Sequence, residues 1–189
     1  REIDALIFVG LPFEKSGKLY NTAAALNHGK ILGLVPKSNL PTYSEFYEGR
    51  HFTPGDAEAE DIEIGGEIVP FGTDILFQAS DMPHLIVAAE ICEDLWVPYP
   101  PSVDHVLAGA SVVVNLSASD ELVGKGSYRR QLVRSHSASC ISGYIYATAG
   151  EGESSTDLVF GGQNMIAENG SILAEAKRFR NETIYGDID

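Results

Sequence analysis

The chain has 189 residues, 44% of them apolar, so it is long enough for one domain with a hydrophobic core and too apolar to be disordered. Its formal net charge of −14 at pH 7 argues against a nucleic-acid partner, because phosphate contacts need clustered Lys and Arg. No apolar run approaches the roughly 20 residues that span a bilayer, and the N-terminus lacks the order of a signal peptide. We therefore expect a cytoplasmic protein with no membrane partner.

The first third of the chain reads as strands joined by tight turns. Residues 5–9 form a short apolar run typical of a buried strand, which Gly-Leu-Pro at 10–12 should close. Two further apolar runs, 19–26 and 30–35, flank an Asn-His-Gly turn and predict a hairpin. A second hairpin is expected over 62–69, around a Gly-Gly pair.

The middle of the chain predicts strands with a helix between them. Residues 85–91 and 111–116 are continuous apolar runs, as in strands that are buried on both faces. Between them, residues 102–109 predict a helix with Ser102 as its N-cap and Gly109 near its end.

The last third begins with a longer helix, expected over 127–142, and a strand over 143–149. Residues 164–167 and 171–176 should then pair across Glu-Asn-Gly, since Asn-Gly is a favoured hairpin turn. This mixed order of strands and helices, with no internal repeat or linker, predicts a single α/β layered domain over 1–189.

Cys92 ends an apolar strand and is surrounded by the carboxylates of Glu90, Glu93 and Asp94. A cysteine used only for packing usually has apolar neighbours, so Cys92 is a candidate nucleophile. The alternative is a small core residue at a strand end, and this segment alone leaves both readings open. Cys140 lies among small residues in the second predicted helix and reads as a packed side chain. We expect both thiols to be free, because disulfides are rare in the cytosol.

Four segments of the sequence help to decide between a nucleophile and a core residue at Cys92. The first segment contains Lys37, which follows an apolar strand. Together they resemble the nitrilase superfamily, and most closely the glutamine amidotransferase domain of glutamine-dependent NAD synthetases. The segments occur in the family's order and cover most of the chain: Val-Pro-Lys-Ser-Asn-Leu-Pro-Thr-Tyr-Ser-Glu-Phe-Tyr-Glu at 35–48, Glu-Ile-Cys-Glu-Asp-Leu-Trp-Val-Pro at 90–98, Asn-Leu-Ser-Ala-Ser at 115–119 and Ala-Gly-Glu-Gly-Glu-Ser-Ser-Thr-Asp-Leu at 149–158.

The resemblance implies an α-β-β-α sandwich and a Glu-Lys-Cys catalytic triad. It places the triad glutamate upstream of the first predicted strand, so we expect an N-terminally truncated, partial domain that lacks this residue. It also implies a C-terminal synthetase domain in the same polypeptide, which would use ATP and Mg, while the present domain would need no cofactor. A homo-oligomer is a further expectation from the family.

The resemblance assigns the chemistry to three residues. Cys92 would attack the side-chain carboxamide of L-glutamine, release ammonia and form a glutamyl thioester that water hydrolyses. Lys37 would lower the pKa of the thiol and stabilise the oxyanion together with the backbone N–H of Glu93. Glu45, eight residues after Lys37, matches an acidic position that would hold Lys37 and position the substrate. The alternative for Glu45 is an exposed loop carboxylate.

Five residues match substrate-binding positions of the family. Tyr43 and Phe46 would line the glutamine pocket, with ordinary core packing as the alternative. Glu93 would bind the α-ammonium group through a charge-assisted hydrogen bond. Ser119 and Lys125 would bind the α-carboxylate, and the alternative for both is a solvated loop.

The leading hypothesis is therefore a glutaminase domain that supplies ammonia to an NAD synthetase and is inactive alone for want of its base. Another nitrilase-type amidase or carbamoylase is a second possibility, and a non-catalytic assembly module is a third. The five histidines are scattered, with no His-x-His or Cys-x-x-Cys spacing, so no metal site is expected.

Overall fold

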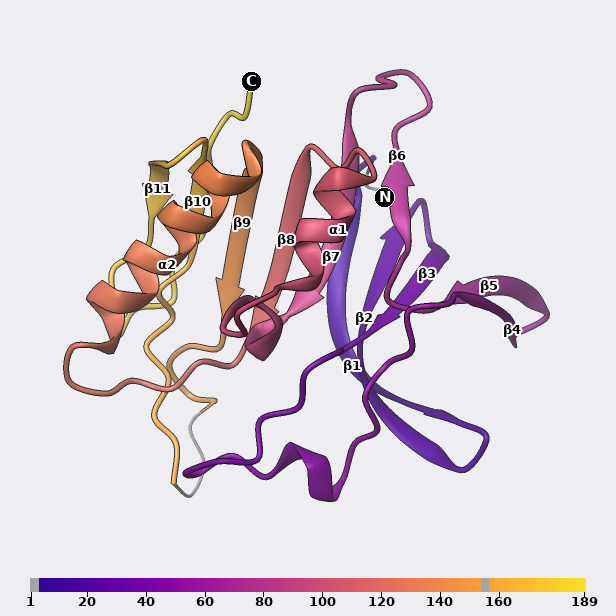
Figure 1. The fold of residues 1–189 in the computed structure, drawn as a ribbon, viewed down its shortest axis with the longest axis horizontal. Coiled ribbons are helices and arrows are strands. Elements are labelled where there is room, and N and C mark those ends of the chain that lie inside the picture. Colours follow the sequence, from indigo (N-terminus) through magenta and orange to yellow (C-terminus); the bar gives the residue numbers. More distant parts are fainter. Residues whose placement is uncertain (1–3, 154–156) are drawn as a thin grey trace.

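The computed structural model describes residues 4–153 and 157–189, and within these ranges the chain forms two β-sheets. The first sheet has the strand order β1-β2-β3-β5-β4, and the second has the order β11-β10-β9-β8-β7-β6. Helices α1 and α2 lie over the second sheet (Figure 1). The predicted α/β class is therefore confirmed, and the described residues supply one helical layer.

The first sheet is built from the two predicted hairpins and one further strand. Glycines with positive φ stand in both turns, Gly29 between β2 and β3 and Gly65 and Gly66 between β4 and β5. These turns suit glycine because it has no Cβ. The strands are β1 (Ile7–Lys15), β2 (Lys18–Asn27), β3 (Lys30–Pro36), β4 (Glu60–Ile64) and β5 (Glu67–Phe71).

Strand β1 is longer than the sequence predicted. Gly10 to Pro12 do not close it, and pairing with β2 continues as far as Lys15. The prediction was wrong because β1 is an edge strand of its sheet, where a proline need not donate to a neighbouring ladder.

The second sheet has a parallel centre. Strands β7, β8 and β9 pair in parallel, and α1 (Pro101–Leu107) and α2 (Lys125–Cys140) connect them in turn. Neither helix in the described part of the chain is long and apolar enough to cross a membrane. The strands are β6 (Leu76–Gln78), β7 (Ile86–Ile91), β8 (Val112–Ser117), β9 (Gly143–Thr148), β10 (Met165–Glu168) and β11 (Ser171–Glu175).

Both helices exist where expected, but their ends differ from the prediction. Pro100 is the N-cap of α1 and Pro101 is its first residue. Proline suits the first position of a helix, because a backbone N–H there would have no hydrogen-bond partner within the helix. Ser102 is therefore not the cap; its backbone N–H donates to Glu90 at 3.2 Å. Helix α2 starts and stops two residues early, and its end is marked by Ile141 in left-handed backbone.

Alternating side chains divide the interior into three clusters. Ala23 and Ala25 of β2 face the second sheet and pack with Ala89 of β7 in the cluster between the sheets. Val113 of β8 points the other way, to the side covered by the helices, where it packs with Val133 of α2. A third cluster lies on the far face of the first sheet, under the β4–β5 hairpin. Strands β7 and β8 of the second sheet are thus buried on two faces, as their apolar runs predicted.

Candidate active site

Cys92 and Lys37 each come directly after a strand, one in each sheet. Cys92 follows Ile91 at the end of β7, and Lys37 follows Pro36 at the end of β3. Ligands of α/β proteins commonly bind outside the carboxyl ends of the strands. Here both side chains line one cavity of 410 Å³. The structure therefore brings the candidate nucleophile and the candidate cation together.

The backbone at Cys92 is in the left-handed region, with φ of 48°. Such a conformation costs a non-glycine residue about 1–3 kcal/mol and persists where the surroundings hold it. The Cys92 N–H donates to Asn115 Oδ1 at 3.2 Å, which ties the turn to strand β8. Cys92 also begins a short 3-10 helix, η2 (Cys92–Leu95). The strand thus ends sharply at the thiol, which contributes to two cavities.

The electrostatic environment of Cys92 combines burial with opposing charges. Burial raises the pKa of the thiol above its usual value, and this effect outweighs the others. Lys37 lowers the pKa, as do hydrogen bonds from the Ala118 backbone and the Ser117 hydroxyl, whereas the Glu48 carboxylate raises it. The thiol is therefore protonated at neutral pH in this arrangement, and attack on a substrate needs a proton acceptor.

Lys37 is 1% exposed and forms an ion pair with Glu48. Glu48 also accepts a hydrogen bond from Asn21 Nδ2 at 3.2 Å and begins the 3-10 helix η1 (Glu48–Arg50). Glu45 lies in a preceding turn, half-buried, and forms no ion pair within the described residues. The expectation that Glu45 holds Lys37 is corrected, because the path of this loop turns Glu48 toward the lysine.

A second cavity, of 540 Å³, shares Cys92 with the first. It lies between the loop after β3, the start of η2 and the loop that leads into α2. All five residues predicted to bind substrate line it, together with two further aromatic side chains: Tyr43, Phe46, Glu93, Ser119, Lys125, Trp96 and Tyr128.

This second cavity carries one group of each charge. Tyr43 donates from its hydroxyl to the Glu93 carboxylate, with both O···O distances 2.9 Å. Partial burial raises the pKa of Glu93, and this outweighs the hydrogen bond from Tyr43 and the charges of Lys37 and Lys125. Lys125 forms an ion pair with Asp120, and its Nζ lies 5.4 Å from the centre of the Trp96 ring. A zwitterionic ligand would match these two charges.

The sequence profile of the carbon-nitrogen hydrolase family matches residues 1–189. The chain belongs to this family. The resemblance to nitrilase-type enzymes is thereby confirmed, and the strand-end cysteine lies in a carbon-nitrogen hydrolase.

Relatives by sequence point to one branch of the carbon-nitrogen hydrolases. The chain is 54% identical over 174 residues to the glutamine-dependent NAD(+) synthetase of Mycobacterium tuberculosis, a match covering 92% of this chain and 26% of the relative. It is 30% identical over 187 residues to the human protein of that name, covering 93% of this chain and 26% of the relative. The chain thus spans about a quarter of the length of these relatives.

Solved structures show the same fold. The glutamine-dependent NAD(+) synthetase of Cytophaga hutchinsonii superposes with a TM-score of 0.80 at 28% identity, over 92% of this chain and 27% of that one. Nit3 of Saccharomyces cerevisiae, a member of branch 10 of the nitrilase superfamily, matches with a TM-score of 0.69 at 19% identity, over 91% and 55%. The predicted nitrilase-type architecture is confirmed by these matches.

Arg129 of this carbon-nitrogen hydrolase supports the loop of Ser119, which lines the second cavity, and the sequence analysis gave Arg129 no role. It is fully buried in α2 and donates to Ser119 Oγ at 3.1 Å, to Glu121 at 2.7 Å and to Gln163 at 2.6 Å. A signal was present, because Arg129 shares a helical face with Val133, four residues later. Its charge suggested exposure, but paired arginines can be buried.

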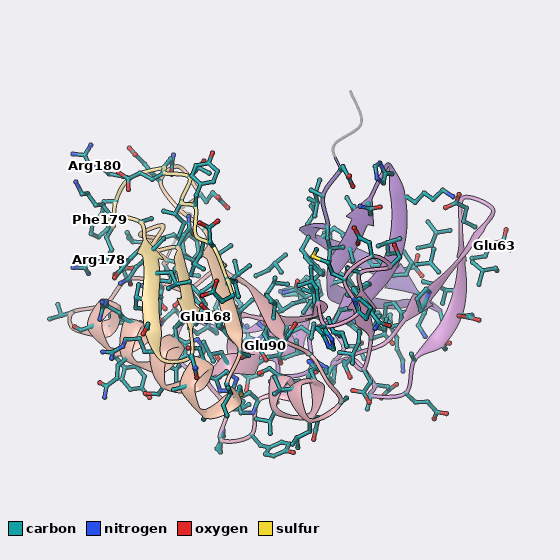
Figure 2. All side chains as sticks on the ribbon, turned by 90° about the horizontal axis from the view of Figure 1, so that it is seen from above. Glu63, Glu90, Glu168, Arg178, Phe179 and Arg180 are labelled. Carbon is teal, nitrogen blue, oxygen red and sulfur yellow. The ribbon has the colours of Figure 1, made fainter. Side chains whose placement is uncertain are left out.

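Glu90 was also given no role, and it lies in the middle of the molecule (Figure 2). It is 1% exposed and accepts hydrogen bonds from the Ser102 N–H, from Asn115 Nδ2 at 3.3 Å and from the Tyr144 hydroxyl. Because Asn115 also accepts from the Cys92 N–H, Glu90 orients the amide that holds the nucleophile turn. Its position two residues before the cysteine was the only available signal.

The described residues contain no group of three or more His, Cys, Asp or Glu side chains that could hold a metal ion. Cys92 and Cys140 are free thiols. The arrangement brings together a free thiol, a buried lysine and a charged cavity beside them.

Proposed function

We propose that this domain hydrolyses the side-chain amide of L-glutamine through a thioester on Cys92. The observation that carries the proposal is that the five substrate-binding candidates and Cys92 line one cavity, with Lys37 on the other side of the thiol. Support also comes from the relatives named glutamine-dependent NAD(+) synthetases. Their names indicate the use of glutamine, and the charges of Glu93 and Lys125 suit an amino acid.

In the first half of the proposed reaction, the Cys92 sulfur attacks the carboxamide carbon. The oxyanion that forms receives a hydrogen bond from Lys37 Nζ and another from the Glu93 N–H, which has no partner within its short helix. The proton of the thiol passes through a general base to the leaving nitrogen. The C–N bond then breaks, ammonia leaves and a glutamyl thioester remains.

In the second half, water attacks the thioester and the C–S bond breaks. Glutamate leaves, and the thiol recovers a proton. The same base would deprotonate the water, as microscopic reversibility requires of an acid–base group that serves both steps. In the described residues, Glu48 and Glu153 line the first Cys92 cavity and Glu93 lines the second, and Glu48 is engaged with Lys37. Because the resemblance to the family assigns the general base to none of these carboxylates, we propose that it comes from outside these 189 residues.

The ammonia is proposed to serve a synthetase in the same polypeptide that makes NAD from its deamido precursor. This rests on the name of the relatives and on their greater length, of which this chain covers 26%. ATP and Mg are proposed to act in that synthetase, with no cofactor in the present domain.

The proposal is tested by Cys92→Ala in the full-length protein. We expect loss of glutamine-dependent NAD synthesis with free ammonium still supporting synthesis, because the thiol serves only amide hydrolysis. Cys140→Ala is the matched control and should retain both activities, since this thiol is remote from the two cavities. Unchanged glutamine-dependent synthesis in Cys92→Ala, measured as NAD formed, would reject the assignment of the nucleophile.

A further inference from the structure

Asp94, two residues after the nucleophile, connects the two sheets beside the reactive groups. Its side chain is 1% exposed. Oδ2 accepts hydrogen bonds from the Ile91 N–H at 2.9 Å and the Ser38 N–H at 3.5 Å. Oδ1 accepts from the Asn39 N–H at 2.8 Å and from Asn39 Nδ2 at 2.9 Å. One buried carboxylate thus receives donors from both strand-end segments.

These donors belong to the segments that carry the catalytic pair. Ile91 is the last residue of β7 in the second sheet, directly before Cys92, whereas Ser38 directly follows Lys37 after β3 of the first sheet. Hydrogen bonds to an ionised acceptor are about twice as strong as neutral ones. The carboxylate of Asp94 is therefore a direct link between the two sheets at the point where Lys37 meets the thiol.

We propose that Asp94 is a positioning residue that keeps Lys37 in register with Cys92 across the two sheets, and that it does so only while its carboxylate is ionised. The inference deepens the proposed function by adding a residue to the same site. Its physical basis is that Lys37 lowers the pKa of the Cys92 thiol, so displacement of the lysine leaves less thiolate.

The pKa of Asp94 lies close to neutral pH, so a small fall in pH changes its protonation state. Burial and the charge of Glu90 raise its pKa to about 6, although hydrogen bonds from Ile91 and Asn39 lower it. The charged groups that interact with it are Glu90 in β7 and Glu93 in η2, and Lys37 directly precedes Ser38, whose N–H donates to Asp94. Below about pH 6 a proton on Asp94 would oppose one of the N–H donors, since a protonated carboxyl keeps only part of its acceptor capacity.

The test measures alkylation of the thiols in the full-length protein by iodoacetamide, a small reagent with the amide group that the site is proposed to bind. Peptide mass spectrometry follows Cys92, with Cys140 as an internal reference thiol. We expect Asp94→Asn to slow alkylation of Cys92 by about 10²-fold, the effect of an error of about 1 Å in placement, and to leave Cys140 unchanged. Asp104→Asn is the control, because Asp104 is an exposed carboxylate that accepts only a hydrogen bond from Tyr99 among the described contacts.

The pH profile separates positioning from a loss of packing. In the wild-type protein the logarithm of the Cys92 rate should rise with a slope of two below about pH 6, because both Asp94 and the thiol must ionise, and with a slope of one above it. Asp94→Asn should give a slope of one throughout. The same profile in both proteins, or equal slowing of Cys92 and Cys140, would overturn the proposal.

A milder variant covers the case in which Asp94→Asn does not fold. Asn39→Ala removes the side-chain donor and keeps the backbone ones, so we expect a several-fold slowing at Cys92 and a break that moves above pH 6, because a hydrogen bond that lowers the pKa of Asp94 is lost. An unchanged rate would overturn the proposal. Alkylation does not depend on glutamine. A protein with these labelling effects and no glutamine turnover would reject the proposed function and leave the role of Asp94 standing.

Discussion

The two cavities on either side of Cys92 differ in how they are built. On the side of Lys37, the lysine directly follows strand β3, is 1% exposed and is paired with Glu48 before any ligand arrives. On the side of Tyr43, which is 54% exposed, the lining comes from the loop after β3, the short helix η2 and the start of α2, and includes Phe46 and Trp96. The comparison teaches that groups aimed at the reacting atoms are fixed by the sheets, whereas groups aimed at the rest of the ligand are carried on adaptable segments.

The largest predicted effect concerns the general base that would act on Cys92 in the cavity that Lys37 lines. The isolated chain of 189 residues should hydrolyse glutamine about 10²–10⁴-fold more slowly than the full-length protein, because general-base assistance is typically worth that much and Glu48 is engaged with Lys37. The measurement is ammonia release from glutamine by both proteins. Equal turnover would assign the base to one of the carboxylates that line the two Cys92 cavities in the described residues, which are Glu48, Glu153 and Glu93.

Removal of the buried cation should come next in size. Lys37→Ala in the full-length protein should lower kcat for glutamine by about 10²–10³-fold, because an oxyanion donor is lost, with little change in KM. Steady-state kinetics of glutamate formation would measure this split. A rise in KM with kcat intact would instead place Lys37 among the binding groups and erase the distinction between the two cavities.

In the second cavity, which is lined by Glu93, a substitution should change KM more than kcat, the reverse of the effect expected for Lys37→Ala. Glu93→Gln should raise KM for glutamine about 10–100-fold, as expected for loss of a hydrogen bond to a charged group worth about 1.5–3 kcal/mol, with a smaller change in kcat. The matched substrate is a simple amide without an α-ammonium group, which the variant should hydrolyse as the wild type does. Equal losses for both substrates would favour the alternative of a general nitrilase-type amidase.

The smallest effect compares two carboxylates of one loop. Glu48→Gln should lower kcat by about tenfold, because Lys37 loses its charged partner while the 25% exposure of the Glu48 side chain lets water compensate in part. Glu45→Gln, the matched control, should keep kcat within about twofold, since Lys37 pairs with Glu48 and not with Glu45. If Glu45→Gln were the more damaging of the two, the role that the resemblance gave to Glu45 would return.

The parts of the molecule that the sequence predicted are those with local signals. The apolar runs of β7 and β8, the Asn169-Gly170 turn and the position of Cys92 at a strand end follow from periodicity and turn chemistry. Periodicity and turn chemistry could not identify Glu48 as the partner of Lys37 or Arg129 as a buried residue. Which carboxylate reaches Lys37 depends on the path of a loop, and the burial of Arg129 depends on partners far away in sequence.

Small side chains separate the sheets behind the site. Ala23 and Ala25 of β2 pack with Ala89 of β7 in the cluster between the two sheets, and none is more than 1% exposed. Since packed interiors have little free space, one added methyl group there would push the sheets apart. We therefore expect substitutions of these alanines to change the distance between Lys37 and Cys92. A library restricted to these alanines could retune reactivity without altering any residue that touches the ligand.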